Sequence, residues 1–170
     1  MTPDQRTILL VEDNEDDVFI FQRAYRQAQL THPVQIVRDG QQAMDYLRGE
    51  GEFADRARYP LPFLVLLDLK LPLTPGLEVL QLLRTHPNLR GLMVVVLTSS
   101  AESRDVLRAH ELGAQAFLVK PPSPSMIAAA VSAIQSRLNG ADPVKRPAIA
   151  GDLFNVPLPT RRDQDARRTL

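Results

Sequence analysis

The strongest constraint on the fold of this chain is a regular alternation of short apolar runs with longer segments of helical spacing. Most of the apolar runs do not alternate polar with apolar residues, which is typical of parallel strands covered by helices on both faces. Repeated strand–helix alternation predicts a doubly wound α/β sheet. The expected strands are residues 8–11, 34–37, 63–67, 92–97 and 115–119, and the expected helices are residues 14–29, 40–50, 76–86, 101–112 and 124–138.

The first expected helix has a well-defined apolar face. At about 100° per residue the buried face should hold residues 20, 21, 24, 25 and 28. Phe19 points nearly opposite this face. Two interpretations of Phe19 are open, namely a rim residue half covered by a neighbouring loop and an apolar contact for a partner protein.

Two segments lie outside the alternation. Residues 49–62 contain Gly and Pro breakers and mixed charges, so we expect a solvated loop, with a partner contact as the less favoured reading. Helical spacing ends at Asn139 and Gly140, which predicts a domain of residues 1–140. Residues 141–170 form a Pro/Arg-rich tail, for which a disordered tail, a strap along the domain and an arm exchanged in a dimer remain open. We expect no effector domain in this tail.

Composition excludes several classes of function. Twenty Lys and Arg residues balance twenty Asp and Glu residues, so no overall field attracts nucleic acid or an anionic membrane. The absence of cysteine excludes disulfides, thiolate zinc sites and cysteine nucleophiles. Every apolar run is far shorter than the roughly 20 residues of a membrane span. We therefore expect a soluble cytoplasmic protein with no direct DNA binding and no membrane contact.

The residues at the ends of the expected strands carry the chemistry. Glu12 and Asp13 follow the first strand, Asp68 the third, Thr98 the fourth and Lys120 the fifth. Ligands of open parallel sheets bind outside the carboxyl ends of the strands, so these side chains should share one crevice. Each residue alone is weak evidence, because an acidic pair after a strand is often only a helix start. Their convergence from four strands indicates a site.

The residue types at these strand ends favour phosphoryl chemistry with a metal ion. Three close carboxylates repel one another unless a cation compensates, and hard oxygen ligands suit Mg²⁺. An ammonium and a hydroxyl are useful around phosphoryl oxygens. The nucleophile would be a carboxylate, because the cleft has no cysteine and no histidine.

Four motifs together resemble a response-regulator receiver domain over roughly residues 6–138. They are ILLVEDN at 8–14, LLDLKLP at 66–72 with Gly76-Leu77-Glu78, VVVLTS at 94–99, and GAQAFLVKP at 113–121. The resemblance implies a flavodoxin-like three-layer sandwich with a five-stranded parallel sheet of order 2-1-3-4-5 and five helices. The long loop before the third strand is similar to that of the stand-alone receivers that serve bacterial phytochrome histidine kinases.

The resemblance assigns a metal site residue by residue. Asp68 matches the phosphoacceptor, which also contacts the ion. Asp13 matches the direct Mg²⁺ ligand, and Glu12 matches the acidic neighbour that acts through water. The backbone carbonyl of Lys70 matches the remaining protein ligand.

The resemblance also assigns the groups that respond to phosphorylation. Thr98 matches the switch hydroxyl, and Lys120 matches the lysine that pairs with the phosphoryl group. Phe117 occupies the aromatic switch position and lacks a hydroxyl, so it can signal only by ring burial. Ser99 is the small residue expected after the switch hydroxyl. Pro121 implies a cis peptide after Lys120, for which the sequence alone gives only a low prior.

The implied function is that of a two-component response regulator. A sensor histidine kinase, with a phytochrome as the candidate, would donate a phosphoryl group to Asp68 in the presence of Mg²⁺. Output would pass to a downstream phosphotransfer or effector protein, and a homodimer is a further candidate assembly. We expect no enzyme activity beyond self-phosphorylation from small donors and autodephosphorylation.

Other functions fit the residues less well. A haloacid-dehalogenase-type hydrolase needs a second Asp where this chain has Lys70, and Glu12 and Asp13 would repel the phosphate of a flavin. Neither GxGxxG nor GxxxxGK[ST] occurs, so nucleotide binding lacks its usual anchors. The main alternative is an interaction module or a phosphate sink, in which binding or dimerisation matters more than phosphorylation-dependent output.

Overall fold

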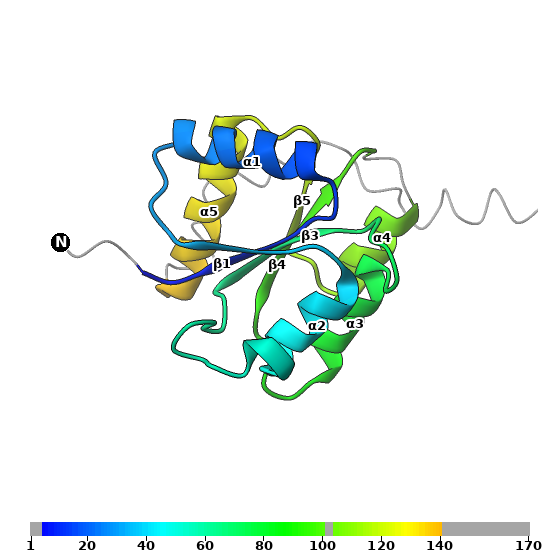
Figure 1. The fold of residues 1–170 in the computed structure, drawn as a ribbon. Helices are drawn as coiled ribbons and strands as arrows, with labels where there is room; N and C mark the ends of the chain where they lie inside the picture. Colours follow the sequence, from blue (N-terminus) through cyan, green and yellow to red (C-terminus); the bar gives the residue numbers. More distant parts are fainter. Residues whose placement is uncertain (1–4, 101–103, 141–170) are drawn as a thin grey trace, which may run out of the picture.

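Five parallel strands form one sheet with helices on both faces (Figure 1). The computed structural model describes residues 5–100 and 104–140. The strand order is β2-β1-β3-β4-β5, which confirms the expected α/β architecture. The elements in chain order are β1 (Ile8–Val11), α1 (Glu15–Gln27), β2 (Val34–Val37), α2 (Gly40–Arg48), the 3₁₀ turn η1 (Gly51–Phe53), β3 (Leu64–Asp68), α3 (Gly76–Thr85), β4 (Met93–Thr98), α4 (Arg104–Glu111), β5 (Ala116–Val119) and α5 (Pro124–Leu138).

The sheet separates two apolar cores. Helices α1 and α5 cover one face, and α2, α3 and α4 cover the other (Figure 1). Successive residues of a strand point to opposite faces, so Ile8 and Leu10 belong to the α1/α5 core while Leu9 and Val11 belong to the other. All four are fully buried. This double burial is the reason why the strand sequences are continuously apolar.

Side-chain caps fix where the helices begin. Asn14 accepts a hydrogen bond of 3.0 Å from the amide three residues on, and Asp39 accepts one of 2.7 Å in the same way. Ser123 caps α5, whose first turn contains Pro124. Each such cap contributes about 1 kcal/mol to stability. The cap at Asn14 starts α1 directly after Glu12 and Asp13.

Three strands differ from expectation by one residue. β3 (Leu64–Asp68) and β4 (Met93–Thr98) both begin and end one residue later than predicted, whereas β5 only begins one residue later, at Ala116. Asp68 pairs in register with Leu97, and Thr98 pairs with Val119. Backbone pairing continues through a polar side chain, so apolar patterning placed the ends of β3 and β4 too early. The expected helix at 101–112 is observed as Arg104–Glu111, and residues 101–103 lie outside the described residues.

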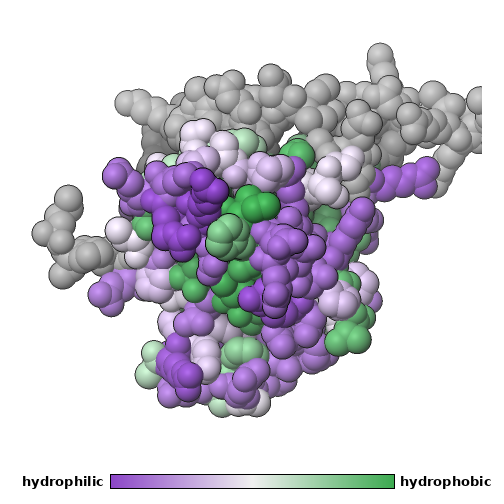
Figure 2. Space-filling model, turned by 45° about the horizontal axis from the view of Figure 1, so that its top comes forward, coloured by the Kyte–Doolittle hydropathy of each residue, from purple (hydrophilic) through white to green (hydrophobic). Residues whose placement is uncertain are grey.

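The buried face of α1 also differs from expectation. Val18 is buried, whereas Ile20, which we expected in the core, is 42% exposed. Ile20 lines a small hollow together with Lys120, Pro121 and Pro122, at the border between the core and the strand-end residues. Phe19 is 60% exposed, so it lies outside the core. Figure 2, turned to bring the top of Figure 1 forward, shows hydrophobic surface between hydrophilic areas.

The expectation of a solvated loop at residues 49–62 holds only in part, because most of these residues are exposed but the segment also packs against α2. Phe53 is buried and its ring lies 5.2 Å from that of Tyr46 and 5.1 Å from that of Tyr59. The Arg56 guanidinium donates hydrogen bonds to the backbone carbonyls of Tyr46, Leu47 and Tyr59 at 2.7, 2.8 and 3.2 Å. Arg56 therefore adds a charged donor to carbonyls at the carboxyl end of α2, where the Tyr46 carbonyl also accepts a hydrogen bond of 3.2 Å from the Gly49 amide. The loop is a packed extension of α2.

Two further expectations concern the whole chain. None of the helices within residues 5–100 and 104–140 is long and apolar enough to cross a membrane. The expected tail of residues 141–170 lies outside the described residues.

We predict that Arg56→Met lowers the free energy of unfolding by about 1–3 kcal/mol, because half-buried carbonyls lose their charged donor. Urea unfolding followed by circular dichroism measures this effect. The matched control is Arg58→Met in the same loop, where the guanidinium only lies over the Tyr59 ring at 5.2 Å and should contribute less than about 1 kcal/mol. Equal losses in the two variants would contradict the anchoring role.

Candidate functional site

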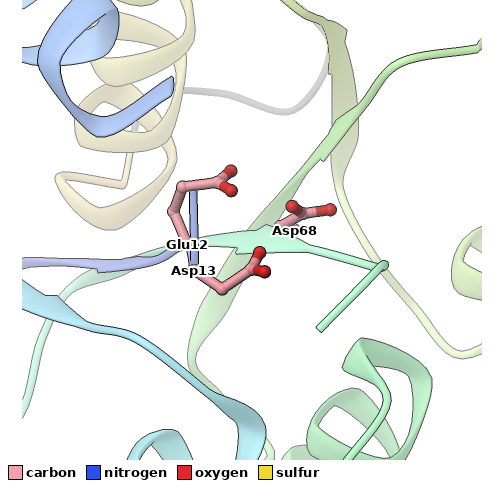
Figure 3. A group of neighbouring side chains, drawn as sticks. All are labelled: Glu12, Asp13 and Asp68. Carbon is pink, nitrogen blue, oxygen red and sulfur yellow. The ribbon is translucent and has the colours of Figure 1, made fainter. Parts of the chain in front are cut away.

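The carboxyl ends of the strands bring the expected site residues to one edge of the sheet. Glu12 and Asp13 follow β1, and Asp68 is the last residue of β3 (Figure 3). Carboxylate oxygens of these three residues lie within 4.8 Å of one another. Thr98 ends β4, and Lys120 follows β5 directly. The parallel register therefore creates the predicted crevice.

Glu12 is a buried carboxylate, with a side chain only 2% exposed. Its Oε1 atom accepts a hydrogen bond of 3.2 Å from the Asn14 amide. Its Oε2 atom has no hydrogen-bond partner and lies 2.6 Å from Lys120 Nζ as an ion pair. Burial raises the pKa of Glu12 to about 7, against the opposing effect of Lys120 and with a further upward contribution from the charge of Asp68. Added positive charge near Glu12 would favour its ionised form.

The Lys120 ammonium lies between the carboxylates of the site. Its Nζ atom donates hydrogen bonds to Oδ2 of Asp68 at 2.8 Å and to Oδ2 of Asp17 at 3.1 Å. Burial lowers the pKa of Lys120, but its close contacts with the carboxylates of Asp68 and Glu12, and their negative charges, outweigh burial and leave the pKa above its ordinary value. The ammonium therefore remains charged. The peptide bond from Lys120 to Pro121 is cis, in agreement with the expectation from the resemblance.

The backbone around Asp68 is tightly held. The Oδ1 atom of Asp68 accepts a hydrogen bond of 2.9 Å from the Lys70 amide. The first residue of α3, Gly76, donates its amide to the Leu69 carbonyl at 3.1 Å. A Cβ atom at Gly76 would lie 2.4 Å from the Asp68 carbonyl oxygen, so only glycine allows this close approach. The Asp68 side chain is thus presented from a rigid backbone.

Thr98 and Phe117 occupy the positions expected for a switch pair. The Thr98 hydroxyl donates a hydrogen bond of 2.9 Å to the Ser100 carbonyl and accepts one of 3.2 Å from the Ser100 amide. Thr98 is buried, and Phe117 is half-buried against the core beneath α2, α3 and α4. Ser99, next to Thr98, is exposed. The hydroxyl is therefore engaged by the start of the β4–α4 loop in this structure.

The acidic group fits a hard divalent cation. Glu12, Asp13 and Asp68 offer several oxygen ligands within a small space, and oxygen ligands of this type are those that Mg²⁺ and Mn²⁺ bind. The buried Oε2 atom of Glu12 is paired with a single ammonium, that of Lys120, and Asp13 is exposed to solvent. Glu12, Asp13 and Asp68 are thus the residues that would hold such an ion.

Asp17 contacts the site and was not anticipated as a site residue. It lies in the first turn of α1, where an acidic residue is ordinarily explained by the helix dipole. Its contact with Lys120 joins residues 103 positions apart in the sequence. The only sequence signal was the placement of Asp17 within the turn that Asn14 caps.

Comparison with known proteins decides the family. Residues 8–132 match the family described as the response regulator receiver domain. The chain belongs to this family. Response regulator Rcp1 of Synechocystis sp. is 39% identical over 115 residues, which are 68% of this chain and 76% of that protein.

Solved structures of response regulators resemble this receiver in fold and sequence. The bacteriophytochrome response regulator RtBRR is 45% identical, with a TM-score of 0.69 over 75% of this chain and 76% of that one. The phosphorylated cyanobacterial phytochrome response regulator RcpA is 36% identical, with a TM-score of 0.66 over 81% of this chain and 96% of that one. The Mn²⁺-bound form of Rcp1 is 36% identical, with a TM-score of 0.63 over 84% and 99%. This receiver is thus similar to phytochrome response regulators.

We predict that Asp13→Asn weakens Mn²⁺ binding by about tenfold or more, because the site loses an ionised oxygen ligand. Loss of a group that merely hydrogen-bonds to a metal ligand already lowers metal affinity by roughly 10–100-fold. Calorimetric titration of the metal-free protein measures the affinity. Asp16→Asn is the charge-matched control, since Asp16 is an exposed residue of α1 outside the acidic group. If both variants lost affinity equally, Asp13 would contribute only long-range charge.

Proposed function

We propose that this receiver accepts a phosphoryl group on Asp68 from the phosphohistidine of a sensor kinase. The observation that carries the proposal is the environment of the Asp68 carboxylate. One of its oxygens accepts a hydrogen bond from Lys120, the other accepts one from the Lys70 amide, and the carboxylates of Glu12 and Asp13 lie beside it. A nucleophilic carboxylate next to a fixed ammonium and a cation-binding group suits phosphoryl transfer, which needs mainly positioning and charge stabilisation.

The transfer step balances without a further reactant. An Asp68 oxygen forms a bond to phosphorus while the bond from phosphorus to the donor histidine nitrogen breaks, and that nitrogen keeps the electron pair. A Mg²⁺ ion held by Glu12, Asp13, Asp68 and the Lys70 carbonyl would supply positive charge at the phosphoryl oxygens. Lys120 then pairs with the transferred group as a compact charge with three donors.

The response to phosphorylation would start at Thr98. Its hydroxyl leaves the Ser100 backbone and donates to a phosphoryl oxygen, which vacates the space beside β5. The Phe117 ring then turns inward and alters the surface formed by α4, β5 and α5. Two packings of one side-chain pair, biased by a local charge, are sufficient for such a switch.

Partners follow from the relatives. Because similar proteins are phytochrome response regulators, a phytochrome-type histidine kinase is the proposed phosphodonor, with Mg²⁺ as the physiological ion and the cytoplasm as the location. Output would pass to a downstream phosphotransfer or effector protein, and residues 141–170 or a second copy of the chain are further candidates for contact. Catalysis would be limited to self-phosphorylation from small donors and autodephosphorylation. No observation favours the interaction-module or phosphate-sink alternative.

We predict that the wild-type protein gains one phosphoryl group from a small phosphodonor with Mg²⁺, and that Asp68→Asn gains none, because an amide is a poor nucleophile. Intact-protein mass spectrometry measures the gain. The melting temperature of the variant controls for folding. Mg²⁺-dependent labelling that persists in Asp68→Asn would place the acceptor elsewhere.

We predict that Thr98→Ala still takes up the phosphoryl group but loses most of the accompanying movement of Phe117, because no hydroxyl draws the β4–α4 loop inward. Ring signals of phenylalanine-labelled protein, recorded by NMR before and after phosphorylation, report this movement. Ser100→Ala is the control, since Thr98 bonds only to the backbone of Ser100. Equal shifts of the Phe117 signals in wild type and Thr98→Ala would refute the coupling.

A further inference from the structure

Three carboxylates surround the Lys120 ammonium, and two of them accept hydrogen bonds from it. One acceptor is Asp68 at the end of β3, and the other is Asp17 in the first turn of α1. The Lys120 side chain is 15% exposed, Asp68 7% and Asp17 37%. The ammonium thus lies inside the crevice, while Asp17 closes the crevice from its solvent side.

We propose that Asp17 is a positioning residue, which anchors the Lys120 ammonium beside Asp68 before and during phosphoryl transfer. This inference rests on the proposed function of Asp68 and Lys120. It assigns to α1 a part in the reaction that acts through Lys120, in addition to the packing of the helix against the sheet.

The anchor is needed because a lysine side chain is flexible. Its four-carbon stem has many rotamers, so each further acceptor restricts where the ammonium lies. The third nearby carboxylate, Glu12, makes the shortest contact with the ammonium, an ion pair of 2.6 Å. Glu12 and Asp68 both belong to the acidic group that would hold a metal ion, whereas Asp17 does not. Asp17 is therefore the carboxylate that remains available to the ammonium alone.

The two acceptors differ in what the reaction does to them. When Asp68 becomes an acyl phosphate, its carboxylate loses its negative charge to the phosphoryl group, and its bond to Lys120 weakens. Asp17 is unchanged by the reaction and keeps its charge. It therefore holds the ammonium at the site while the charge moves from the carboxylate to the phosphoryl oxygens.

The position of Asp17 itself is secure. Its backbone amide donates to the Asn14 side chain at 3.0 Å, which fixes the first turn of α1 regardless of the side chain at residue 17. Substitutions there should therefore leave the fold intact. The neighbouring Asp16 is exposed and lies in the same turn, so it shares the helix dipole and the net charge but has no described contact with Lys120.

The first test measures the ammonium directly and requires neither metal nor phosphodonor. The chain has three lysines, Lys70, Lys120 and Lys145, so the ¹⁵N signals of the side-chain ammonium groups are few. Exposed ammonium protons exchange rapidly with water, and hydrogen-bonded ones exchange more slowly. Asp17→Ala should raise the rate of proton exchange at the Lys120 ammonium about threefold or more, whereas Asp16→Ala should leave this rate unchanged. A change of this size corresponds to the loss of one charged hydrogen bond near the surface.

The second test is the rate of phosphorylation by acetyl phosphate with Mg²⁺. Removing a negative charge near an anionic donor should by itself speed the reaction, so a pure charge effect makes Asp17→Ala, Asp17→Asn and Asp16→Ala equally faster. Anchoring predicts the opposite sign: Asp17→Ala slower by about threefold, Asp17→Asn intermediate because its amide oxygen still accepts a hydrogen bond, and Asp17→Glu close to wild type.

Each outcome decides a separate point. Unchanged ammonium exchange in Asp17→Ala overturns the anchor. Faster exchange with a phosphorylation rate equal to or above wild type overturns its part in the transfer. If the wild type takes up no phosphoryl group from either acetyl phosphate or a kinase, the proposed function is wrong. The exchange measurement then still tests whether Asp17 restrains the Lys120 ammonium.

Discussion

The site depends on one ammonium placed among carboxylates that would otherwise repel one another. Asp68, Glu12 and Asp17 all lie within 3.1 Å of Lys120 Nζ. These carboxylates come from β3, the end of β1 and α1, and the lysine comes from the end of β5. Three regions distant in the sequence, around residues 12–17, 68 and 120, are therefore tied together by charge. One ammonium does not neutralise all of this negative charge, which is why the same crevice suits an additional cation.

The carboxylates differ in burial, so the site has a buried side and a solvent-exposed side. Glu12 is almost completely enclosed, whereas Asp13 is exposed and Asp17 is partly exposed. The crevice thus has a dry interior, where charge interactions are strong, and an open side, where a donor can approach. Cores on both faces of the sheet hold this geometry, because the strands that end at the crevice are buried along their length.

Much of the fold could be predicted from the sequence, because strands that are buried on both faces must be apolar at every position. Strand-end residues such as Asp68 and Thr98 could be assigned to one site because a parallel sheet brings the carboxyl ends of its strands to the same edge. Contacts that depend on irregular backbone or on distant pairing could not be predicted. Nothing in the sequence around Arg56 indicates that its guanidinium donates to backbone carbonyls of α2. Asp17 has the sequence signature of an ordinary helix start, and its role is visible only when the end of β5 is placed beside α1. Ile20 was wrongly expected in the core, because helical spacing shows which face of α1 is apolar but not how far the neighbouring elements cover that face.

The rigid backbone at Asp68 has a consequence for how relatives of this protein can diverge. Its strand pairs with β4, and Gly76 abuts its carbonyl, so the acceptor cannot shift relative to the sheet. With Asp68 as the proposed acceptor, evolutionary variation around the carboxylate is then left to the loops that border the crevice. Substitutions in those loops would change access of water to Asp68 and leave the strand that carries it in place.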